Sequence, residues 1–297
     1  MKIKLLGTKD YEKADETNYG DCIIVDNGEE LLVYDCGSEE HAQKVCEYME
    51  SEGYDKATFV LSHNDDDHFK GLLYLIEEEK VSEIWTTLLL KHKTELLKAI
   101  GDGRKNRDSI ANQILELFDN IAKLSGQELR DVYADMPETK EIISGVYFAG
   151  PDFDYMINRV AAKALDTRQG DSIDGESITN AMSIQLCVEI GTHKVLLTGD
   201  SSFEGIKDNL EECDIIQLPH HGKQKQAEQI LEEKELCTDI IYLVSDNTGN
   251  SNGGSDDMMN ECGKGQIIWN TKEKGTINVT NENIQRVLRG TVGAWGV

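Results

Sequence analysis

An apolar run that ends in histidines and aspartates constrains the fold more than any other feature of the sequence. The segment 57–68 is ATFVLSHNDDDH, and its first six residues predict a buried strand. His63 and His68 then flank three adjacent aspartates whose charges repel one another. Either the segment is a solvated loop with an acidic helix start, or a cation lies there and removes the repulsion. The apolar residues that follow have helical spacing and predict a helix beginning near residue 66.

The spacing of these side chains suits a metal site. In an extended segment, residues two apart point the same way, so His63 and Asp65 converge on one point. Asp67 and His68 lie in the first helical turn and can face a second point nearby. Four imidazole and carboxylate groups within six residues have the density of metal ligands. A run of aspartates alone would fit an acidic helix cap equally well, and His63 favours the metal site.

Two further strand ends carry the same kinds of side chain. The run VLLTGD ends in Asp200, and IIQLPHHG ends in His220 and His221. A lone aspartate after a strand is most often a turn residue, and paired histidines before glycine can belong to a solvated loop. Three polar strand ends in one chain nevertheless favour a shared site.

Strand and helix patterns occur in two similar halves. The first half predicts strands at 2–7, 22–28, 30–38 and 57–62, with Asn27-Gly28 as a hairpin turn and helices at 39–52 and from about 66. The second half predicts strands within 142–151, 183–200, 213–219, 239–247, 266–271 and 275–280, with helices at 203–211 and 226–236. Residues 88–140 differ in character and predict a helical insertion. The pattern indicates an α+β fold in which two sheets are sandwiched between helices.

The charge balance argues against general long-range attraction to nucleic acid. The chain has 56 acidic and 30 basic residues, so its formal net charge is -26 and it repels polyanions as a whole. Residues 91–107 are an exception, with six basic and two acidic residues. This segment is either a solvated helix pair or a flap that grips phosphate.

The cysteines and the ends of the chain point to a reducing compartment. The seven cysteines are odd in number, scattered and without a CxxC pair, which argues against a disulfide framework and a cysteine zinc site. The first residues are too short for a secretory leader, and no apolar run approaches the roughly 20 residues of a membrane span. We therefore expect a cytoplasmic protein without membrane contact. The end GTVGAWGV either docks on a protein partner or frays.

Taken in order, these motifs resemble a known family. The segment 63–68 is similar to the HxHxDH signature of the metallo-β-lactamase fold, in the HxDxDH form of the competence-protein ComEC-like branch. The other segments that carry the resemblance are NYGDCIIV, LLVYDCGS, TNAMSIQL, VLLTGD, LPHHGK and NTKEKGTINV, and they cover most of the chain. The resemblance implies a four-layer αβ/βα sandwich, formed by residues 1–297 as a single domain with the insertion at about 88–140.

The resemblance also implies a set of metal ligands. His63 and Asp65 would hold one ion, Asp67 and His68 a second, and Asp200 would bridge them. Either His220 or His221 would complete the set. Oxygen-rich ligation shifts the preference from zinc towards manganese or magnesium, so the implied cofactors are two divalent ions, Zn or Mn, with Mg as a further alternative.

Two departures from the family weaken the predicted site. The wider fold carries another histidine before the bridging aspartate, and here the only histidines in that interval are His92, in the insertion, and His193, at a hairpin turn. The ComEC-like branch also has a later histidine where this chain has SDNTGNSNGG. An amide ligand is weaker than imidazole, so substitution by asparagine would leave one ion loosely held. The candidate substitutes are Asn180, Asn247 and Asn252.

The predicted chemistry is hydrolysis of a phosphodiester, in nucleic acid or a nucleotide, by water activated between two divalent ions. Asp67 would orient the water, and His68 or the member of the 220/221 pair not bound to metal would protonate the leaving group. The candidate catalytic residues are Asp67, His68 and His221. The candidate substrate-binding residues are Asn180, Lys223 and Lys225.

Two other functions fit the same sequence. The fold also supports hydrolysis of a small ester, thioester or lactone. The missing histidines also fit a regulatory protein that binds metal without turnover. Turnover of a generic phosphodiester with manganese distinguishes these hypotheses.

Overall fold

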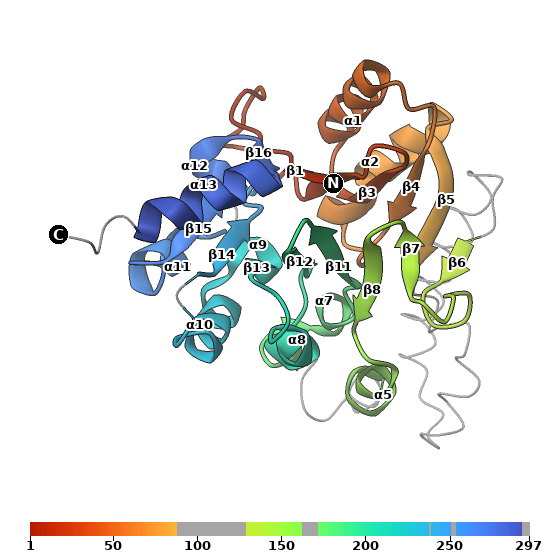
Figure 1. The fold of residues 1–297 in the computed structure, drawn as a ribbon. Coiled ribbons are helices and arrows are strands. Elements are labelled where there is room, and N and C mark those ends of the chain that lie inside the picture. The colour runs from red at the N-terminus through yellow and green to blue at the C-terminus, as the bar shows by residue number, and fades with distance from the viewer. Residues whose placement is uncertain (88–128, 162–171, 238, 251–253, 293–297) are drawn as a thin grey trace.

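The computed structural model describes residues 1–87, 129–161, 172–237, 239–250 and 254–292. Two large sheets of seven strands dominate these residues (Figure 1). The first sheet has the order β16 (Ile277–Val279), β1 (Lys2–Leu5), β2 (Cys22–Asp26), β3 (Leu31–Cys36), β4 (Ala57–Val60), β5 (Val81–Thr86), β6 (Leu129–Asp131). The second has the order β15 (Ile267–Asn270), β14 (Ile241–Val244), β13 (Ile215–Gln217), β12 (His193–Leu197), β11 (Gln185–Ile190), β8 (Val146–Gly150), β7 (Glu141–Ile143). The predicted α+β sandwich is confirmed.

Apolar residues fill three layers between the secondary-structure elements. One cluster combines inward-facing residues of both sheets, such as Leu32 and Tyr34 from β3 and Leu186 from β11. A second packs the other face of the first sheet against α1 (Glu39–Glu52) and α2 (Asp66–Glu77). Because β3 is buried on both faces, it opens with four consecutive apolar residues rather than an alternating pattern, and only Asp35 interrupts the apolar sequence.

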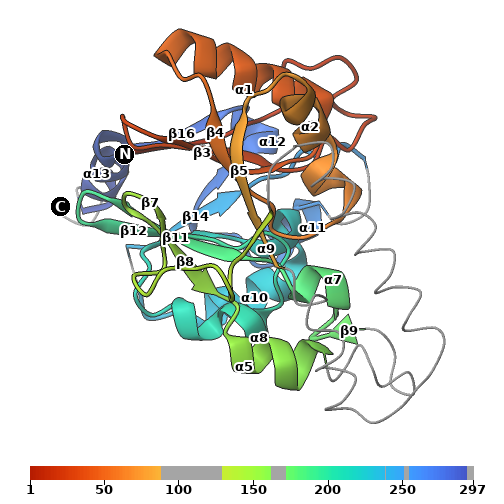
Figure 2. The same cartoon turned by 90° about the vertical axis from the view of Figure 1, so that its right-hand side faces the viewer.

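Helices cover the outer face of the second sheet in the same way (Figure 2). The third apolar cluster joins that sheet to α8 (Phe203–Ile206), α10 (Gln224–Glu233) and α11 (Asp256–Glu261). The order of layers is therefore helix, sheet, sheet, helix. A small two-stranded sheet consists of β9 (Ser172–Ile173) and β10 (Glu176–Ser177). The other short helices are α5 (Phe153–Tyr155), α7 (Ile178–Ala181), α9 (Pro219–Gly222) and α12 (Thr271–Lys274), and the longer α13 spans Asn281–Val292.

Most predicted elements lie within a few residues of their observed bounds. The helix predicted at 203–211 is shorter, because α8 continues as a 3-10 turn at Lys207–Asn209. Helix α13 was not predicted, although its sequence is amphipathic. Of the predicted helical insertion, residues 88–128 lie outside the described residues, and residues 129–131 form strand β6. No helix of the described residues is long and apolar enough to cross a membrane.

The polar side chains gather where the carboxyl-terminal edges of the two sheets lie side by side. Strands β3 to β6 run parallel, as do β12 to β15, so their carboxyl ends lie along one edge of each sheet. The Ile184 amide donates to the Ser62 carbonyl at 3.0 Å, and the Tyr34 hydroxyl donates to the Ile184 carbonyl at 2.6 Å. These bonds join the two sheets beside the residues that follow β4.

A glycine allows the chain to approach the start of α2. Gly20 has φ of 70°, and a Cβ built there would lie 1.8 Å from the Asp67 carbonyl oxygen. The next residue, Asp21, donates its amide hydrogen to that same carbonyl at 3.0 Å. Only a residue without a side chain can occupy this position, so Gly20 determines how closely β2 approaches Asp67.

We expect Gly20→Ala to destabilise the protein more than Gly28→Ala. Both positions have positive φ, so each alanine incurs backbone strain of roughly 1–2 kcal/mol. At Gly28 no heavy atom lies within 4 Å of the added Cβ, whereas at Gly20 the clash adds about 1–3 kcal/mol. Urea denaturation of both variants measures the difference, and equal free energies of unfolding would contradict the close approach.

Candidate metal centre

The predicted metal ligands lie together at the shared edge of the two sheets. His63 follows β4, and Asp67 and His68 belong to the first turn of α2. Asp200 follows β12, and His221 lies in the turn after β13. These five residues therefore come from both sheets, as their positions at strand ends predict.

The side chains of His63, His68 and Asp200 lie close together. His63 Nε2 lies 3.7 Å from Asp65 Oδ2 and 4.0 Å from Asp200 Oδ2. His68 Nε2 lies 3.4 Å from the other oxygen of Asp200, Oδ1. The ligand atoms of His63, His68 and Asp200 all lie within 4.8 Å of one another. Asp65 is the N-cap residue of α2 but makes no side-chain capping bond, so its carboxylate is not used as a helix cap.

A second group of ligand atoms lies beside the first. His221 Nε2 is 3.3 Å from Asp67 Oδ2, and with His68 these residues form another group within 4.8 Å. The Asn18 side-chain amide donates to the same Asp67 oxygen at 2.8 Å. Asp66, in contrast, points away from the site and pairs with Lys70 at 2.9 Å. The three aspartates therefore have three different environments.

Buried atoms without hydrogen bonds support the presence of a cation. His63 Nε2, His68 Nε2 and Asp200 Oδ1 are inaccessible to solvent, and each lacks a hydrogen-bond partner. Leaving a buried polar atom unsatisfied costs about 1–3 kcal/mol, so three neighbouring examples need an explanation. Divalent cations bind imidazole nitrogen and carboxylate oxygen, and this donor set fits them.

One buried aspartate, Asp35, orients two of the imidazoles. Its Oδ2 accepts from His68 Nδ1 at 2.8 Å and from the Ser62 hydroxyl at 2.6 Å. Because the Ser62 hydroxyl donates to Asp35, it accepts from His63 Nδ1, which lies 2.9 Å away. Each ring thus donates its Nδ1 hydrogen to this network and directs Nε2 towards the site. A cation bound there would need Nε2 unprotonated, with the hydrogen kept on Nδ1.

Asp21 orients His221 in the same way. Its Oδ1 lies 2.9 Å from His221 Nδ1, and its Oδ2 accepts from the Gln217 amide at 3.2 Å. Asp21 precedes β2 of the first sheet, while Gln217 and His221 belong to the second. The contact therefore also holds the two sheets together at the site.

Charge interactions dominate the titration of the site. Burial lowers the pKa of His68, but the carboxylates of Asp200 and Asp35 raise it more, so it lies well above its usual value. Burial raises the pKa of Asp200, but the charges of His68 and His221 lower it well below its usual value. Without a cation, the neighbouring carboxylates therefore favour the protonated forms of His68 and His221. A bound divalent ion would displace these protons and take over their role.

Of the predicted substrate-binding residues, Asn180 contacts this group, whereas the two lysines pair with other carboxylates. The Asn180 amide nitrogen lies 3.4 Å from Asp200 Oδ2. Lys223 pairs with buried Glu176 at 3.0 Å, and Lys225 pairs with Asp174 at 3.1 Å. Both lysine charges therefore already have partners, and the substrate role of all three residues stays a prediction.

Other side chains considered as substitute ligands are positioned differently. The buried Asn247 donates to the Leu6 and Gly20 carbonyls at 2.9 and 3.0 Å, and its own Oδ1 has no hydrogen-bond partner. His193 pairs with Asp214 at 2.5 Å, away from the ligand groups. His92 and Asn252 lie outside the described residues.

Sequence reasoning missed the carboxylates behind the histidines. Asp21 and Asp35 stand inside two motifs that carried the family resemblance, yet neither was assigned a role. Both lie where an apolar strand begins or ends, which is the same signal that identified Asp200. Glu176 has no comparable signal, because it belongs to a two-residue strand after a polar segment.

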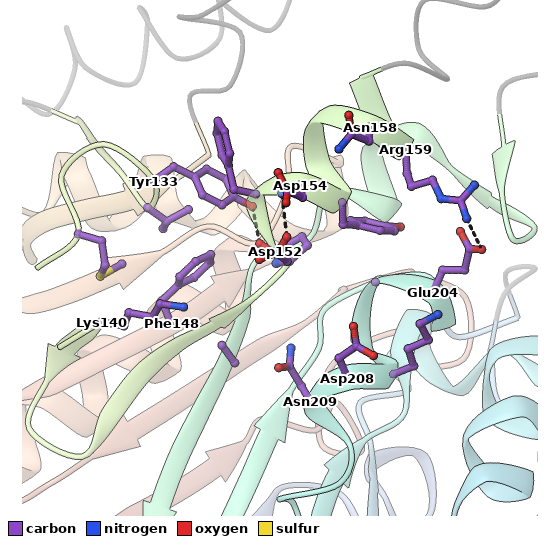
Figure 3. A pocket seen from close by; sticks show the side chains of 18 of the residues that line it. Tyr133, Lys140, Phe148, Asp152, Asp154, Asn158, Arg159, Glu204, Asp208 and Asn209 are labelled. Atoms are coloured by element: carbon purple, nitrogen blue, oxygen red, sulfur yellow. Dashed lines mark hydrogen bonds and ion pairs between the residues drawn. The ribbon is translucent and has the colours of Figure 1, made fainter. Parts of the chain in front are cut away.

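A separate cavity of about 770 Å³ lies apart from the metal ligands (Figure 3). Its walls include Tyr133, Phe148 and Tyr155, and an ion pair of 3.6 Å joins Arg159 to Glu204 at its rim. None of the candidate metal ligands lines it. This cavity is therefore distinct from the candidate metal centre.

Comparison with known proteins identifies the architecture. The family model of the Metallo-beta-lactamase superfamily matches residues 16–157. The chain has the metallo-β-lactamase fold. The metallo-beta-lactamase fold protein YhfI from Bacillus subtilis is 14% identical to this chain, with a TM-score of 0.53. The match covers 94% of this chain and 100% of YhfI. Tm1679, described as a metal-dependent hydrolase of the beta-lactamase superfamily, is 16% identical with a TM-score of 0.51, covering 95% and 100%.

The fold alone does not define the reaction. A variant of the CmlA β-hydroxylase has a TM-score of 0.50 and 12% identity, and covers 94% of this chain and 53% of its own. No curated protein matches the sequence. In this metallo-β-lactamase fold, the activity must therefore be argued from the metal centre itself.

A buried histidine supports the segment that carries Asp21. His41 is fully buried, and its Nε2 donates to the Gly20 carbonyl at 3.1 Å. Because a carbonyl only accepts, Nδ1 must be the acceptor, and the Tyr11 hydroxyl donates to it at 2.9 Å. The neutral ring therefore satisfies both neighbours, and burial lowers the pKa of His41 to about 4.

We expect His41 to make the protein labile to acid. Its pKa is about 4 when folded against about 6.5 when unfolded, so the unfolded state binds the proton first. Stability is fully present above pH 6.5 and is lost as the pH falls towards 4, by about 3 kcal/mol. Urea denaturation at pH 7 and 4.5 measures the loss. His41→Gln should reduce the difference in free energy of unfolding between the two pH values. The same difference in the variant as in the wild type would contradict the assignment.

Proposed function

We propose that the protein is a metal-dependent hydrolase of phosphodiesters. The observation that carries this proposal is the position of Asp200, whose Oδ2 faces His63 while its Oδ1 faces His68. A carboxylate with one oxygen directed to each of two histidine groups is suited to bridging two cations. Pairs of divalent ions are typical of enzymes that break phosphate esters.

The chain's own residues divide between the two positions. His63 and Asp65 would hold one ion, and Asp67, His68 and His221 the other, with Asp200 between them. When bound, divalent ions supply an acidified water as nucleophile and neutralise charge on the bond that breaks. The oxygen ligands favour manganese or magnesium more than an all-histidine site would, and zinc also fits the donor set.

Asp67 is well placed to orient the attacking water. Both of its contacts, from Asn18 and His221, are made to Oδ2, and they fix the plane of the carboxylate. The charge of this group is secure near neutral pH. Burial raises the pKa of Asp67, but the His221 bond and the charge of His68 lower it below its usual value. An ionised carboxylate can accept a hydrogen bond from water and hold it in one orientation.

The acidic protein would attract an anionic substrate only where bound cations offset its negative charge. With a net charge of -26 the surface repels phosphates, so a phosphodiester must gain its attraction from bound cations. The similarity in fold to Tm1679, described as a metal-dependent hydrolase, supports hydrolysis as the reaction. The resemblance of residues 63–68 to the ComEC-like signature supports a phosphodiester in DNA, RNA or a nucleotide. Asn180, Lys223 and Lys225 would contact it.

We expect purified protein to hydrolyse bis-p-nitrophenyl phosphate when manganese is added and to stop when a chelator removes the metal. Asp67→Asn should lower kcat by about 100-fold or more, because it removes the charge that orients the water. The matched control is Asp66→Asn, which changes the neighbouring aspartate but affects only the exposed pair with Lys70. Release of p-nitrophenol measures all three reactions.

The outcome also separates the alternative functions. Faster turnover of a thioester or lactone than of the phosphodiester would replace the proposed substrate class. Protein that holds metal but turns over none of these substrates would be a metal-binding regulator. Equal loss of activity in the Asp66 and Asp67 variants would contradict the role assigned to Asp67.

A further inference from the structure

The neighbouring histidines 220 and 221 have different surroundings. His221 Nε2 faces Asp67 at 3.3 Å, whereas His220 Nε2 faces Asp200 Oδ2 at 3.9 Å. Their rings are 5.9 Å apart with planes at 82°. The two side chains therefore diverge towards different parts of the metal centre.

An unusual backbone produces this divergence. Both residues have left-handed dihedral angles, with φ of 53° at His220 and 56° at His221. Each costs roughly 1–2 kcal/mol relative to a right-handed residue, so the surrounding structure must stabilise them. The His220 amide donates to the Gly199 carbonyl at 3.2 Å, which joins this turn to the residue before Asp200.

His220 has the same support as the other oriented histidines. Its Nδ1 lies 2.6 Å from an oxygen of Glu176, whose side chain is fully buried. His68 has this relation to Asp35 and His221 has it to Asp21. Metal-bound histidines typically donate their second ring hydrogen to a carboxylate in this way. The same carboxylate also pairs with Lys223 at 3.0 Å.

Asp200 Oδ2 is the atom that His220 shares with His63. The two Nε2 atoms lie 3.9 and 4.0 Å from it, and His63 Nε2 is 3.7 Å from Asp65. Ligands about 2.1 Å from one tetrahedral ion are roughly 3.4 Å apart, so both imidazoles would move towards Asp200 Oδ2 on binding an ion there. With His68 assigned to the other ion, an ion at His63 would have the carboxylates of Asp65 and Asp200 as its other described ligands and no second imidazole unless His220 supplies it.

We propose that His220 is the missing imidazole ligand of the ion at His63, Asp65 and Asp200, while His221 binds the other ion. Adjacent residues thus serve separate metal positions, and Glu176 is the positioning residue for His220. The proposal rests on the two-ion centre of the proposed function. It replaces the asparagine substitutes suggested by the sequence with a stronger ligand.

Metal content tests the assignment without relying on activity. Wild type and variants are dialysed against a series of free manganese or zinc concentrations, and bound metal is measured by elemental analysis. Wild type should bind two ions, and His220→Gly and His221→Gly one each. Glycine suits both positions because it accepts the left-handed backbone. His193→Gly should still bind two, because it removes a histidine that is also paired with a carboxylate but lies outside the site.

Glu176→Gln provides a second variant that keeps the ligand and the fold. Losing the supporting carboxylate should weaken binding of one ion by about 10–100-fold and leave the other unchanged. Circular dichroism confirms that each variant is folded. Two ions bound with unaltered affinity by His220→Gly would overturn the proposal and make His220 with Glu176 a proton-transferring pair instead.

The test separates this inference from the proposed function. If wild type hydrolyses the phosphodiester and His220→Gly still binds two ions, only the ligand assignment fails. If wild type binds two ions, His220→Gly binds one and no substrate is turned over, the ligand assignment stands and the proposed function fails.

Discussion

Mutual compensation of buried charge is the constraint on which the site depends. Asp21, Asp35 and Asp200 are almost completely buried and lie within reach of the buried imidazoles of His68 and His221. Isolated buried carboxylates are very costly, so each needs a hydrogen bond and an opposite charge. The imidazoles supply both when protonated, and divalent cations would supply the charge more effectively. The same groups thus support folding and bring the candidate metal ligands together.

The sandwich of two sheets makes this compensation available. Parallel strands bring their carboxyl ends to one edge, and the inter-sheet bonds of Tyr34 and Ser62 with Ile184 hold the two edges together. Asp21 enters from the first sheet to support His221 of the second, and Asp200 enters from the second to face His63 and His68 of the first. Neither half could form the centre alone, so packing of the sheets and assembly of the site are one event.

Oriented histidines give the site its chemical character. Carboxylates or hydroxyls bind Nδ1 of His63, His68, His220 and His221, which leaves each Nε2 directed inwards. Such fixed tautomers reduce the reorganisation needed on metal binding. The acidic surface makes this concentration of ligands more important, because an anionic substrate would find little attraction elsewhere on the described protein.

Local sequence patterns were enough to predict which segments form strands and which end in candidate metal ligands. Apolar runs that end in His63, Asp200 and His220 could be recognised because burial and chain direction act over a few residues. Helix α2 was predictable for the same reason. Helix α13 was missed although its pattern is equally local.

How these segments meet depends on long-range packing that no local pattern reveals. The pairing of Asp21 with His221 spans 200 residues, and that of Glu176 with His220 spans 44. Such contacts depend on the packing of two sheets and on left-handed turns that adjacent side chains must share, and no local pattern encodes them. The separate directions of His220 and His221 are therefore a property of the fold, although both residues were visible in the sequence as one motif.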